Sequence, residues 1–331
     1  MLAIVKADHV GDLVLASPAI NFLAGEQDEV VLFVSPGTEP MARVMFPLLD
    51  VRTIVFPHLA KSRRSDVPSY LHEQVTELAA FDRVVFLRHD HVMNRPRMRG
   101  LVRSPIFTFS DARVHETVAQ VHGLAPFFGT YDRDAYWPGT LRPWPEHPRH
   151  IGLCLGSGFP ANQWPMLRWV QLARALREQG VELSVLRTPR EADRVDLLRR
   201  TLGGEEVDEI PCASLSDMLD RVAALDLVIA TDGGGGHLCS LAAPVLSVAG
   251  SVPFRQFAPF GRHHRVVSMD LPCSPCTNFH PTMLNGCVTY ECIYGIEIAP
   301  VLAAITVPNN HAGQSEALPG RARLFFGMSH A

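Results

Sequence analysis

Short apolar runs alternate with segments of helical periodicity along this chain, and the alternation begins twice. In the first half, the apolar runs at residues 2–5 and 30–34 flank residues 13–24, whose apolar side chains recur at helical spacing. In the second half, the run at 151–155 precedes a helix-like segment at 167–179. Strands that alternate with helices predict parallel sheets with crossover helices, so the pattern indicates an α/β fold in two halves.

A proline-rich stretch separates the two halves. Residues 137–148 interrupt the alternation and have the composition of a linker. At 331 residues the chain is longer than one ordinary core requires, which favours two domains. We therefore expect an N-terminal domain over residues 1–145, a C-terminal domain over 150–307 and a weakly ordered tail over 308–331.

The composition is that of a globular protein with a large core, because 47% of the residues are hydrophobic and 19% are charged. The net charge of −4 argues against a nucleic-acid-binding surface. The sequence contains neither an apolar run long enough to span a membrane nor a charged segment leading into an apolar one at its start. We expect a cytoplasmic protein without a spanning helix or a secretory signal.

Four consecutive glycines form the most distinctive local motif. They follow the apolar run at 227–230 and stand between an aspartate and a histidine. Backbone without side chains can approach a ligand closely, and a loop at the carboxyl end of a strand favours a phosphate. The alternatives are a tight turn that simply requires glycine and a histidine that belongs to the core. The motif predicts an anion-binding loop made of Asp232, Gly233, Gly234, Gly235, Gly236 and His237.

The loop after the first strand contains a candidate base. Asp12 stands at the start of the helix expected over residues 13–24, where it suits either capping that helix or removing a proton from an attacking hydroxyl. Asp8 and His9 are close enough in sequence to compete for the role of base. Lys6 either supplies positive charge nearby or simply ends the strand.

Two loops of the second half are also candidates for ligand contacts. Ser157 and Gly158 follow the strand at 151–155, and their hydroxyl and backbone N–H groups can donate to phosphate. Glu191 follows the strand at 181–186. It suits either hydrogen bonds to a ribose or base, or stabilisation of a helix dipole.

In order and spacing, these motifs resemble the ADP-heptose:lipopolysaccharide heptosyltransferases, glycosyltransferase family 9, over roughly residues 1–305. The resemblance is carried by Gly11-Asp12, by Asn162-Gln163-Trp164-Pro165 after Gly156-Ser157-Gly158, and by the loop at 232–237 with Pro253 and the turn at 259–261. It implies a GT-B architecture, in which two Rossmann-like domains face each other across a cleft.

The resemblance also implies a reaction. The family transfers a sugar with inversion and without a divalent metal, which here means heptose from ADP-heptose to a hydroxyl of an anionic glycan or protein acceptor. It implies that Asp12 is the general base, that Ser157 and Gly158 contact the diphosphate and that Glu191 contacts the nucleoside. The loop at 232–237 would hold the diphosphate or the donor sugar, whose leaving group gains charge during transfer.

The chain departs from the family pattern at two places. Asn162 and Gln163 stand where the family usually has a lysine before its Trp-Pro pair, and Gly233 stands where it usually has a serine or threonine. Both differences remove contacts to phosphate, since a neutral side chain cannot offset the charge of a diphosphate as an ammonium does. We therefore keep two alternatives to a transferase: a nucleotide-sugar epimerase, and a nucleotide-sugar-binding protein without activity.

A basic cluster in the first half is a candidate for acceptor binding. The residues concerned are Lys61, Arg63 and Arg64, with Arg88 after a later strand. In the family, basic residues of the N-terminal domain face anionic acceptors, whereas a charge run more often lies on a solvated loop. Peripheral association with a membrane and formation of an oligomer are kept as further expectations.

Four cysteines cluster near the C-terminus. Cys273 and Cys276 form a Cys-x-x-Cys pair, and Cys287 and Cys292 follow within twenty residues. This spacing is typical of a structural metal site, for which four thiolates suit zinc or iron. Four reduced thiols or one disulfide are the alternatives. A closed four-thiolate site would not be catalytic, because it leaves no open position for a substrate.

Overall fold

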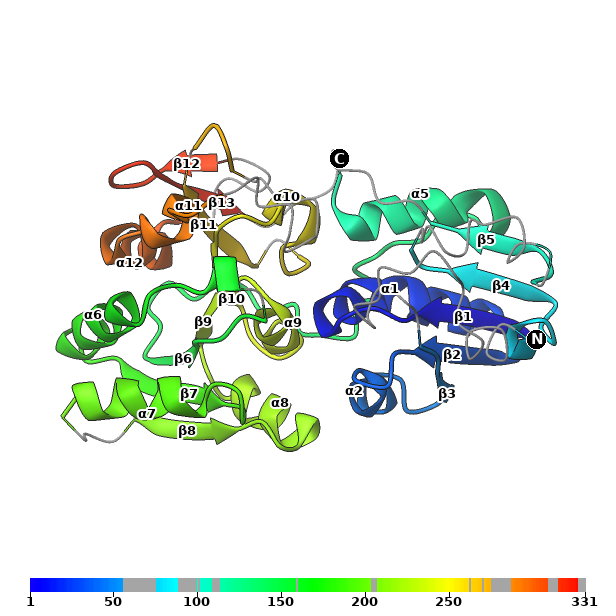
Figure 1. Ribbon diagram of the computed structural model, residues 1–331, viewed down its shortest axis with the longest axis horizontal. Helices are drawn as coiled ribbons and strands as arrows, with labels where there is room; N and C mark the ends of the chain where they lie inside the picture. The colour runs from blue at the N-terminus through cyan, green and yellow to red at the C-terminus, as the bar shows by residue number, and fades with distance from the viewer. Residues whose placement is uncertain are drawn as a thin grey trace. The chain divides into compact units, whose positions relative to one another are not determined.

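The computed structural model describes residues 1–55, 76–88, 100, 102–108, 114–158, 160–203, 207–261, 263–269, 271–274, 287–308 and 315–326. The chain divides into two compact units, Met1–Pro138 and Gly139–Ala331, and each has its own β-sheet (Figure 1). Among the helices of these described residues, none is both long and apolar enough to cross a membrane. The expected α/β fold in two halves is therefore confirmed.

The N-terminal unit contains a parallel sheet with the strand order β3-β2-β1-β4-β5. Its strands are β1 (Leu2–Lys6), β2 (Val30–Val34), β3 (Asp50–Thr53), β4 (Arg83–Phe86) and β5 (Pro105–Phe107). Its helices are α1 (Val10–Glu26), α2 (Glu39–Met45) and α5 (Glu116–Phe128).

Both faces of this sheet are buried. On β1, Leu2 and Ile4 pack with apolar residues of α1 and α5, whereas Ala3 and Val5 pack on the opposite face with a separate cluster that includes Phe81. Apolar side chains at every position of a strand are typical of a parallel sheet that is covered on both sides.

The C-terminal unit contains a larger sheet with the order β12-β13-β11-β10-β9-β6-β7-β8. Its strands are β6 (His150–Cys154), β7 (Glu182–Arg187), β8 (Asp208–Pro211), β9 (Leu227–Thr231), β10 (Val245–Ala249), β11 (Arg265–Met269), β12 (Ser315–Ala317) and β13 (Ala322–Phe326). Its helical segments are η1 (Pro160–Asn162), α6 (Met166–Glu178), α7 (Ala192–Thr201), α8 (Leu215–Ala223), α9 (Gly234–Cys239), α10 (Phe254–Phe257), α11 (Glu291–Tyr294) and α12 (Ile298–Thr306).

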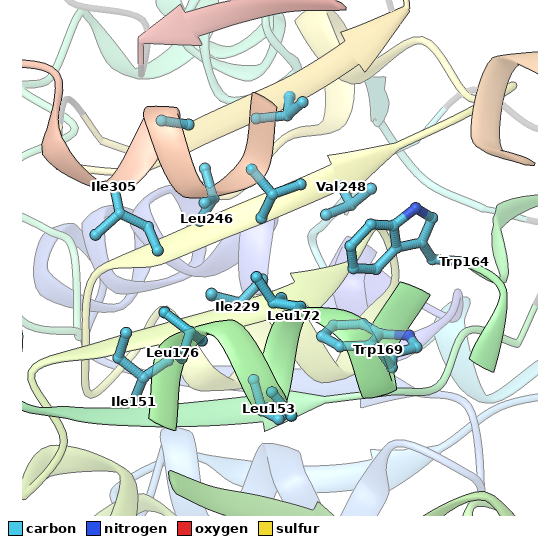
Figure 2. Close-up of a cluster of buried hydrophobic side chains, with 14 of the residues drawn as sticks. Ile151, Leu153, Trp164, Trp169, Leu172, Leu176, Ile229, Leu246, Val248 and Ile305 are labelled. Carbon is cyan, nitrogen blue, oxygen red and sulfur yellow. The ribbon is translucent and has the colours of Figure 1, made fainter. Parts of the chain in front are cut away.

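A tryptophan pair anchors the start of α6 in the core of this unit. Figure 2 shows Trp164 and Trp169 beside apolar side chains of β6, β9 and β10. Their rings meet edge to face with centroids 5.1 Å apart, and the Trp164 indole N–H donates to the Ile296 carbonyl at 2.8 Å. Because Trp164 directly follows the loop after β6, its burial fixes one end of that loop.

The boundary between the units lies earlier than the proline content indicates. The Thr140 N–H donates to the Leu241 carbonyl at 2.8 Å, and the Trp144 indole N–H donates to the Ile305 carbonyl at 2.9 Å. These bonds attach the expected linker to the C-terminal unit. The units therefore divide after Pro138, and not between residues 145 and 150.

The expectation of a weakly ordered tail over 308–331 is wrong for the two strands near its end. β13 pairs antiparallel with β11, and β12 pairs with β13. Ala322, Leu324 and Phe326 are buried at alternate positions of β13, which is the pattern of a strand with one face on the core. The tail contributes an antiparallel edge to an otherwise parallel sheet.

Candidate active site

The order of strands in the C-terminal sheet reverses at β6. The chain continues from β6 to β7 and β8 on one side, whereas β9, β10 and β11 lie on the other side. In open α/β sheets, ligands bind at the carboxyl ends of the strands where this order reverses. The rule selects the loops after β6 and β9, which contain Ser157 and Asp232.

Hydrogen bonds join these two loops. Thr231 Oγ1 donates to the Gly156 carbonyl at 2.8 Å, and Ser157 Oγ donates to the Asp232 carbonyl at 3.0 Å. The Asp232 N–H donates to the Val248 carbonyl of β10 at 3.0 Å. The structure thus brings together two of the residues expected to bind the donor, although they are 75 positions apart.

The glycine run is required by packing and not by an unusual backbone conformation. Gly233 is extended, with φ of 163°, and Gly234 begins the short helix α9. A Cβ would lie 3.2 Å from Ser157 Oγ at Gly233 and 2.6 Å from Cys154 Sγ at Gly235. Ser157 Oγ therefore lies alongside position 233, where the family usually has a hydroxyl side chain.

Substituting Gly235 with alanine is expected to destabilise the protein by about 1–3 kcal/mol, because the new methyl group overlaps Cys154 Sγ. Gly158→Ala is the matched control, since a Cβ there meets no atom within 4 Å. Chemical denaturation of both variants and of the double variant Gly235→Ala/Cys154→Ala measures the effect. The second substitution should recover most of the loss, and equal stabilities of the two glycine variants would contradict the packing argument.

Asp232 is the buried acid of the loop. It is 5% exposed, and its Oδ2 accepts a hydrogen bond of 3.5 Å from the side-chain amide of Asn162. Burial raises the pKa of Asp232 to about 7, because a carboxylate loses its hydration there. The group is therefore close to half-protonated at neutral pH.

Asn162, one of the residues at which the chain departs from the family, links three loops. It is 2% exposed, donates to Asp232, and accepts at Oδ1 from the Ser251 N–H at 3.3 Å and the Ser251 hydroxyl at 3.2 Å. The loops after β6, β9 and β10 thus meet at this side chain. From the sequence alone, Asn162 stands out only as a missing lysine, because partners 70 and 89 positions away leave no local signal.

Glu191 lies against the loop after β6. A Cβ at Gly156 would lie 2.2 Å from Glu191 Oε1, so the glycine leaves room for the carboxyl group. Burial raises the pKa of Glu191, although Arg190 and Arg194 oppose the shift. Gly158 is exposed at the same loop. Ser157, Gly158, Glu191 and Asp232 therefore gather at one edge of the sheet.

His237 is buried within α9, at 5% exposure. It contributes to the environment of His264, whose pKa is lowered well below its usual value by burial and by the neighbouring His263 and His237. The burial of His237 fits the alternative in which this histidine belongs to the core.

The N-terminal sheet reverses its order at β1, between β2 and β4. Asp12 is the third residue of α1, directly after β1, and its side chain is 26% exposed. Its Oδ2 accepts from the His9 N–H at 3.3 Å. Burial and the charge of Asp8 raise the pKa of Asp12, but the interaction with the His9 side chain and the charges of Lys6 and Arg88 outweigh them and lower the pKa overall.

A buried charge cluster supports this edge. Lys6 Nζ lies 2.9 Å from Asp8 Oδ2 and donates to the Leu87 carbonyl at 3.0 Å, with both side chains almost fully buried. Arg88, which follows β4, pairs with the other oxygen of Asp8. Asp8 is therefore engaged by two cations and is removed as a competitor for the role of base. The sequence indicates these residues only singly, because Arg88 lies 80 positions from Asp8.

Four of the predicted site residues lie outside the part of the chain that the structure describes. Lys61, Arg63 and Arg64 of the acceptor cluster lie outside the described residues, and so does Cys276. Of the other cysteines, Cys273 is exposed, Cys287 is partly buried and Cys292 is buried on α11. Within the described part of the chain, no three His, Cys, Asp or Glu side chains are grouped as a metal site requires.

A curated protein matches part of the sequence. Lipopolysaccharide heptosyltransferase 1 of Pseudomonas aeruginosa is 30% identical over 122 residues, which are 37% of this chain and 34% of that protein. The matched segment thus spans about a third of the length of this curated relative.

Two solved proteins share the fold. A family 9 glycosyltransferase from Veillonella parvula matches with a TM-score of 0.65 at 17% identity, covering 91% of this chain and 95% of the other. The E. coli heptosyltransferase WaaC with ADP matches with a TM-score of 0.58 at 15% identity, covering 80% and 92%, and WaaC has also been solved with ADP-2-deoxy-2-fluoro heptose. The GT-B class, with two Rossmann-like domains, is confirmed by these likenesses.

The sequence model of glycosyltransferase family 9 (heptosyltransferase) matches residues 133–285, which include the loops at Ser157, Glu191 and Asp232. The resemblance noted in the sequence is therefore confirmed. Through this segment, the chain is similar to glycosyltransferase family 9, the heptosyltransferase family.

Proposed function

We propose that this chain is an inverting glycosyltransferase that moves heptose from ADP-heptose to a hydroxyl of an anionic glycan or protein acceptor, without a divalent metal. One observation carries the proposal. The loops after β6 and β9 meet where the strand order reverses, and Ser157 and Asp232 are joined there by a hydrogen bond. That position is where open α/β sheets bind their ligands.

The donor is proposed to lie across these loops. Gly158 is exposed and has open space around it, so its backbone can approach a phosphate closely. Glu191 stands beside the same loop, where its carboxyl group can accept hydrogen bonds from the nucleoside. Gly233, Gly234 and Gly235 are only partly buried and present further backbone to a ligand. The ADP of the WaaC structure supports an adenine nucleotide as the leaving group.

Asp12 is proposed as the general base. Its lowered pKa keeps the carboxyl group ionised at neutral pH, ready to accept a proton. The acceptor hydroxyl then attacks the anomeric carbon from the face opposite the diphosphate, and the bond from that carbon to the diphosphate oxygen breaks. The hydroxyl proton passes to Asp12, and the bonding electrons leave with the nucleoside diphosphate.

The acceptor is proposed to meet the basic residues of the N-terminal half, Lys61, Arg63 and Arg64. Their charge suits an anionic glycan such as lipopolysaccharide, the acceptor in the name of the Pseudomonas relative. A cytoplasmic location follows from the need for a soluble nucleotide sugar. Contact with a membrane surface and formation of an oligomer belong to the same proposal.

A binding protein without transfer activity is the second candidate. The observation in its favour is the pair Asn162 and Asp232, which places a neutral amide where an ammonium would otherwise face the diphosphate. Tight binding of a nucleotide sugar with neither hydrolysis nor transfer would support this candidate. Conversion of the donor alone, without an acceptor, would instead indicate an epimerase.

A thermal-shift screen with a panel of nucleotide sugars tests the donor proposal. A ligand present at about 100 times its dissociation constant stabilises the folded state by about 2.7 kcal/mol, which raises the melting temperature measurably. ADP-heptose is expected to give the largest shift. A larger shift with a uridine or guanosine sugar would contradict the proposed donor.

A structural metal is a separate proposal for the C-terminal cysteines, Cys273, Cys276, Cys287 and Cys292. Hydrogen bonds from the backbone at Tyr290 and Thr289 lower the pKa of Cys287, which favours the thiolate that zinc or iron requires. Such a metal would hold this segment together and supply no catalytic step. Elemental analysis of the purified protein should find about one zinc or iron per chain, and Cys287→Ser should reduce it; metal-free protein of full stability would contradict the proposal.

A further inference from the structure

We propose that Asp232 acts as a neutral acid in the donor site, where its protonated carboxyl group donates a hydrogen bond to the diphosphate of the nucleotide sugar. The proposal deepens the function proposed above and rests on it. The proton removes the negative charge of Asp232 and makes it a hydrogen-bond donor, at a site where the family usually has a positively charged lysine nearby.

The position of Asp232 supports this role. It is the first residue after β9, at the edge where the strand order reverses, and only 5% of it is exposed. Its described side-chain partner is the amide of Asn162, a neutral donor at the long distance of 3.5 Å. An amide at that distance stabilises a buried carboxylate weakly, so the carboxyl group keeps a proton far more readily than an exposed aspartate does.

The groups around Asp232 are engaged elsewhere. Among the described residues, the titratable side chains near the loops after β6 and β9 include Cys154, Glu191 and Arg194, together with His237 and Cys239 on α9. The Arg194 guanidinium donates to Gln163 Oε1 at 3.3 Å and to the Trp164 carbonyl at 3.0 Å, while the Glu191 carboxyl group lies against Gly156. Desolvation by burial accounts for the raised pKa of Asp232, without a contribution from these neighbours.

The C-terminal unit contains no lysine that could neutralise the charge of the diphosphate. The chain has two lysines, Lys6 and Lys61, and both precede the C-terminal unit. An ammonium group from this unit therefore cannot face the diphosphate. A carboxylate at Asp232 would repel the phosphates, whereas a neutral carboxyl group can donate to them.

Binding of the donor is then coupled to uptake of a proton. The diphosphate raises the pKa of Asp232 further, because like charges disfavour the ionised form. Well below pH 7 the acid is almost fully protonated and affinity should be independent of pH. Above that value the dissociation constant should rise by up to about tenfold per pH unit, since one pKa unit corresponds to a factor of ten.

Isothermal titration calorimetry with ADP-heptose, from about pH 6 to about pH 9, tests the inference. Both phosphates of this ligand are esterified on each side, so it lacks the second phosphate ionisation near pH 6 that free ADP would add. Titrations in two buffers of different ionisation enthalpy give the number of protons taken up. Near pH 8 the wild-type protein is expected to take up close to one proton for each ligand bound.

Three variants test whether Asp232 is the group that takes up the proton when the donor binds. Asp232→Asn should bind without proton uptake and with affinity independent of pH, because an amide donates at every pH. Asn162→Lys should also lose the pH dependence, since an ammonium beside Asp232 holds it ionised and itself faces the diphosphate. Glu191→Gln tests a second carboxyl group at this edge whose pKa burial raises: its affinity should fall at every pH, because Glu191 is proposed to contact the nucleoside, while the pH dependence of binding should remain that of the wild-type protein.

The possible results separate the two proposals. A slope that persists in Asp232→Asn, or wild-type binding without proton uptake, would overturn the inference and leave the proposed donor intact. Failure of the wild-type protein to bind ADP-heptose at any pH would overturn the proposed function, and the inference with it. If Asp232→Asn does not fold, the loss of the slope in Asn162→Lys decides, and retention of the slope there overturns the inference.

Discussion

Replacing Asp12 with asparagine is expected to lower the rate of sugar transfer by about 10²–10⁴-fold, the usual contribution of a general base. An amide cannot take the proton from the acceptor hydroxyl. Its side-chain oxygen can still accept the hydrogen bond from the His9 N–H, so α1 should begin as in the wild-type protein. Transfer of labelled sugar under saturating donor measures the rate, and the dissociation constant of the donor should not change.

His9→Ala is the control for this prediction. Its side chain is 77% exposed and lies 3.7 Å from Asp12, which makes it the remaining neighbour that could act as base. If Asp12 is the base, His9→Ala should retain most of the transfer rate. A large loss in His9→Ala together with near wild-type transfer in Asp12→Asn would reverse the assignment.

Replacing Lys6 with methionine should destabilise the protein by about 3 kcal/mol, at the low end of the 3–5 kcal/mol typical of a broken buried ion pair. The Lys6 and Asp8 side chains are 1% and 2% exposed, so the substitution leaves a buried carboxylate with only part of its compensation. Arg88 still pairs with Asp8 and limits the loss. Chemical denaturation gives the free energy of unfolding.

An exposed ion pair provides the comparison for Lys6. Arg43 pairs with Glu39 at 2.8 Å on the surface of α2, and Arg43→Met should cost under about 1 kcal/mol. Lys6→Met/Asp8→Asn should recover part of the loss of the single variant, because the buried charge is removed. Equal effects of the Lys6 and Arg43 substitutions would show that burial does not govern this cluster.

Lys6→Met also bears on the proposed base. Burial lowers the pKa of Lys6, but the carboxylates of Asp8, Asp12 and Glu116 outweigh it, so the ammonium stays charged. That charge is one of the influences that lower the pKa of Asp12. Its loss should raise the pKa of Asp12. On acidification, the transfer rate of the variant should therefore begin to fall at a higher pH than that of the wild-type protein.

The sequence predicts those features that local pattern determines. Apolar runs locate β1, β2, β6 and β9, and the glycine run locates the loop at Asp232. Because the carboxyl ends of parallel strands share one edge, the meeting of Ser157, Glu191 and Asp232 follows from the α/β class. In the structure, burial alternates along β13, but its five residues are too short a run to distinguish a strand from a tail in the sequence.

Contacts between distant residues could not be predicted in the same way. Asn162 bonds partners 70 and 89 positions away, and Arg88 meets Asp8 across 80 positions. A polar residue can contact a ligand, or it can be buried and hydrogen-bonded between loops. Which of the two occurs depends on the loops that the strand order brings together. A single sequence shows the residue type, but the pairing comes from the topology. The hydrogen bond from the Trp144 indole to the Ile305 carbonyl, which assigns the linker to the C-terminal unit, also joins residues far apart in the sequence.

The central claim is that the protein transfers sugar from ADP-heptose. The most direct test incubates the purified protein with radiolabelled ADP-heptose and lipopolysaccharide that lacks heptose, with a chelator present, and measures label in the lipid fraction and release of ADP. Transfer of heptose by this protein requires acceptor-dependent incorporation, with one ADP released per sugar transferred. Tight binding of ADP-heptose without incorporation or ADP release under these conditions would contradict it.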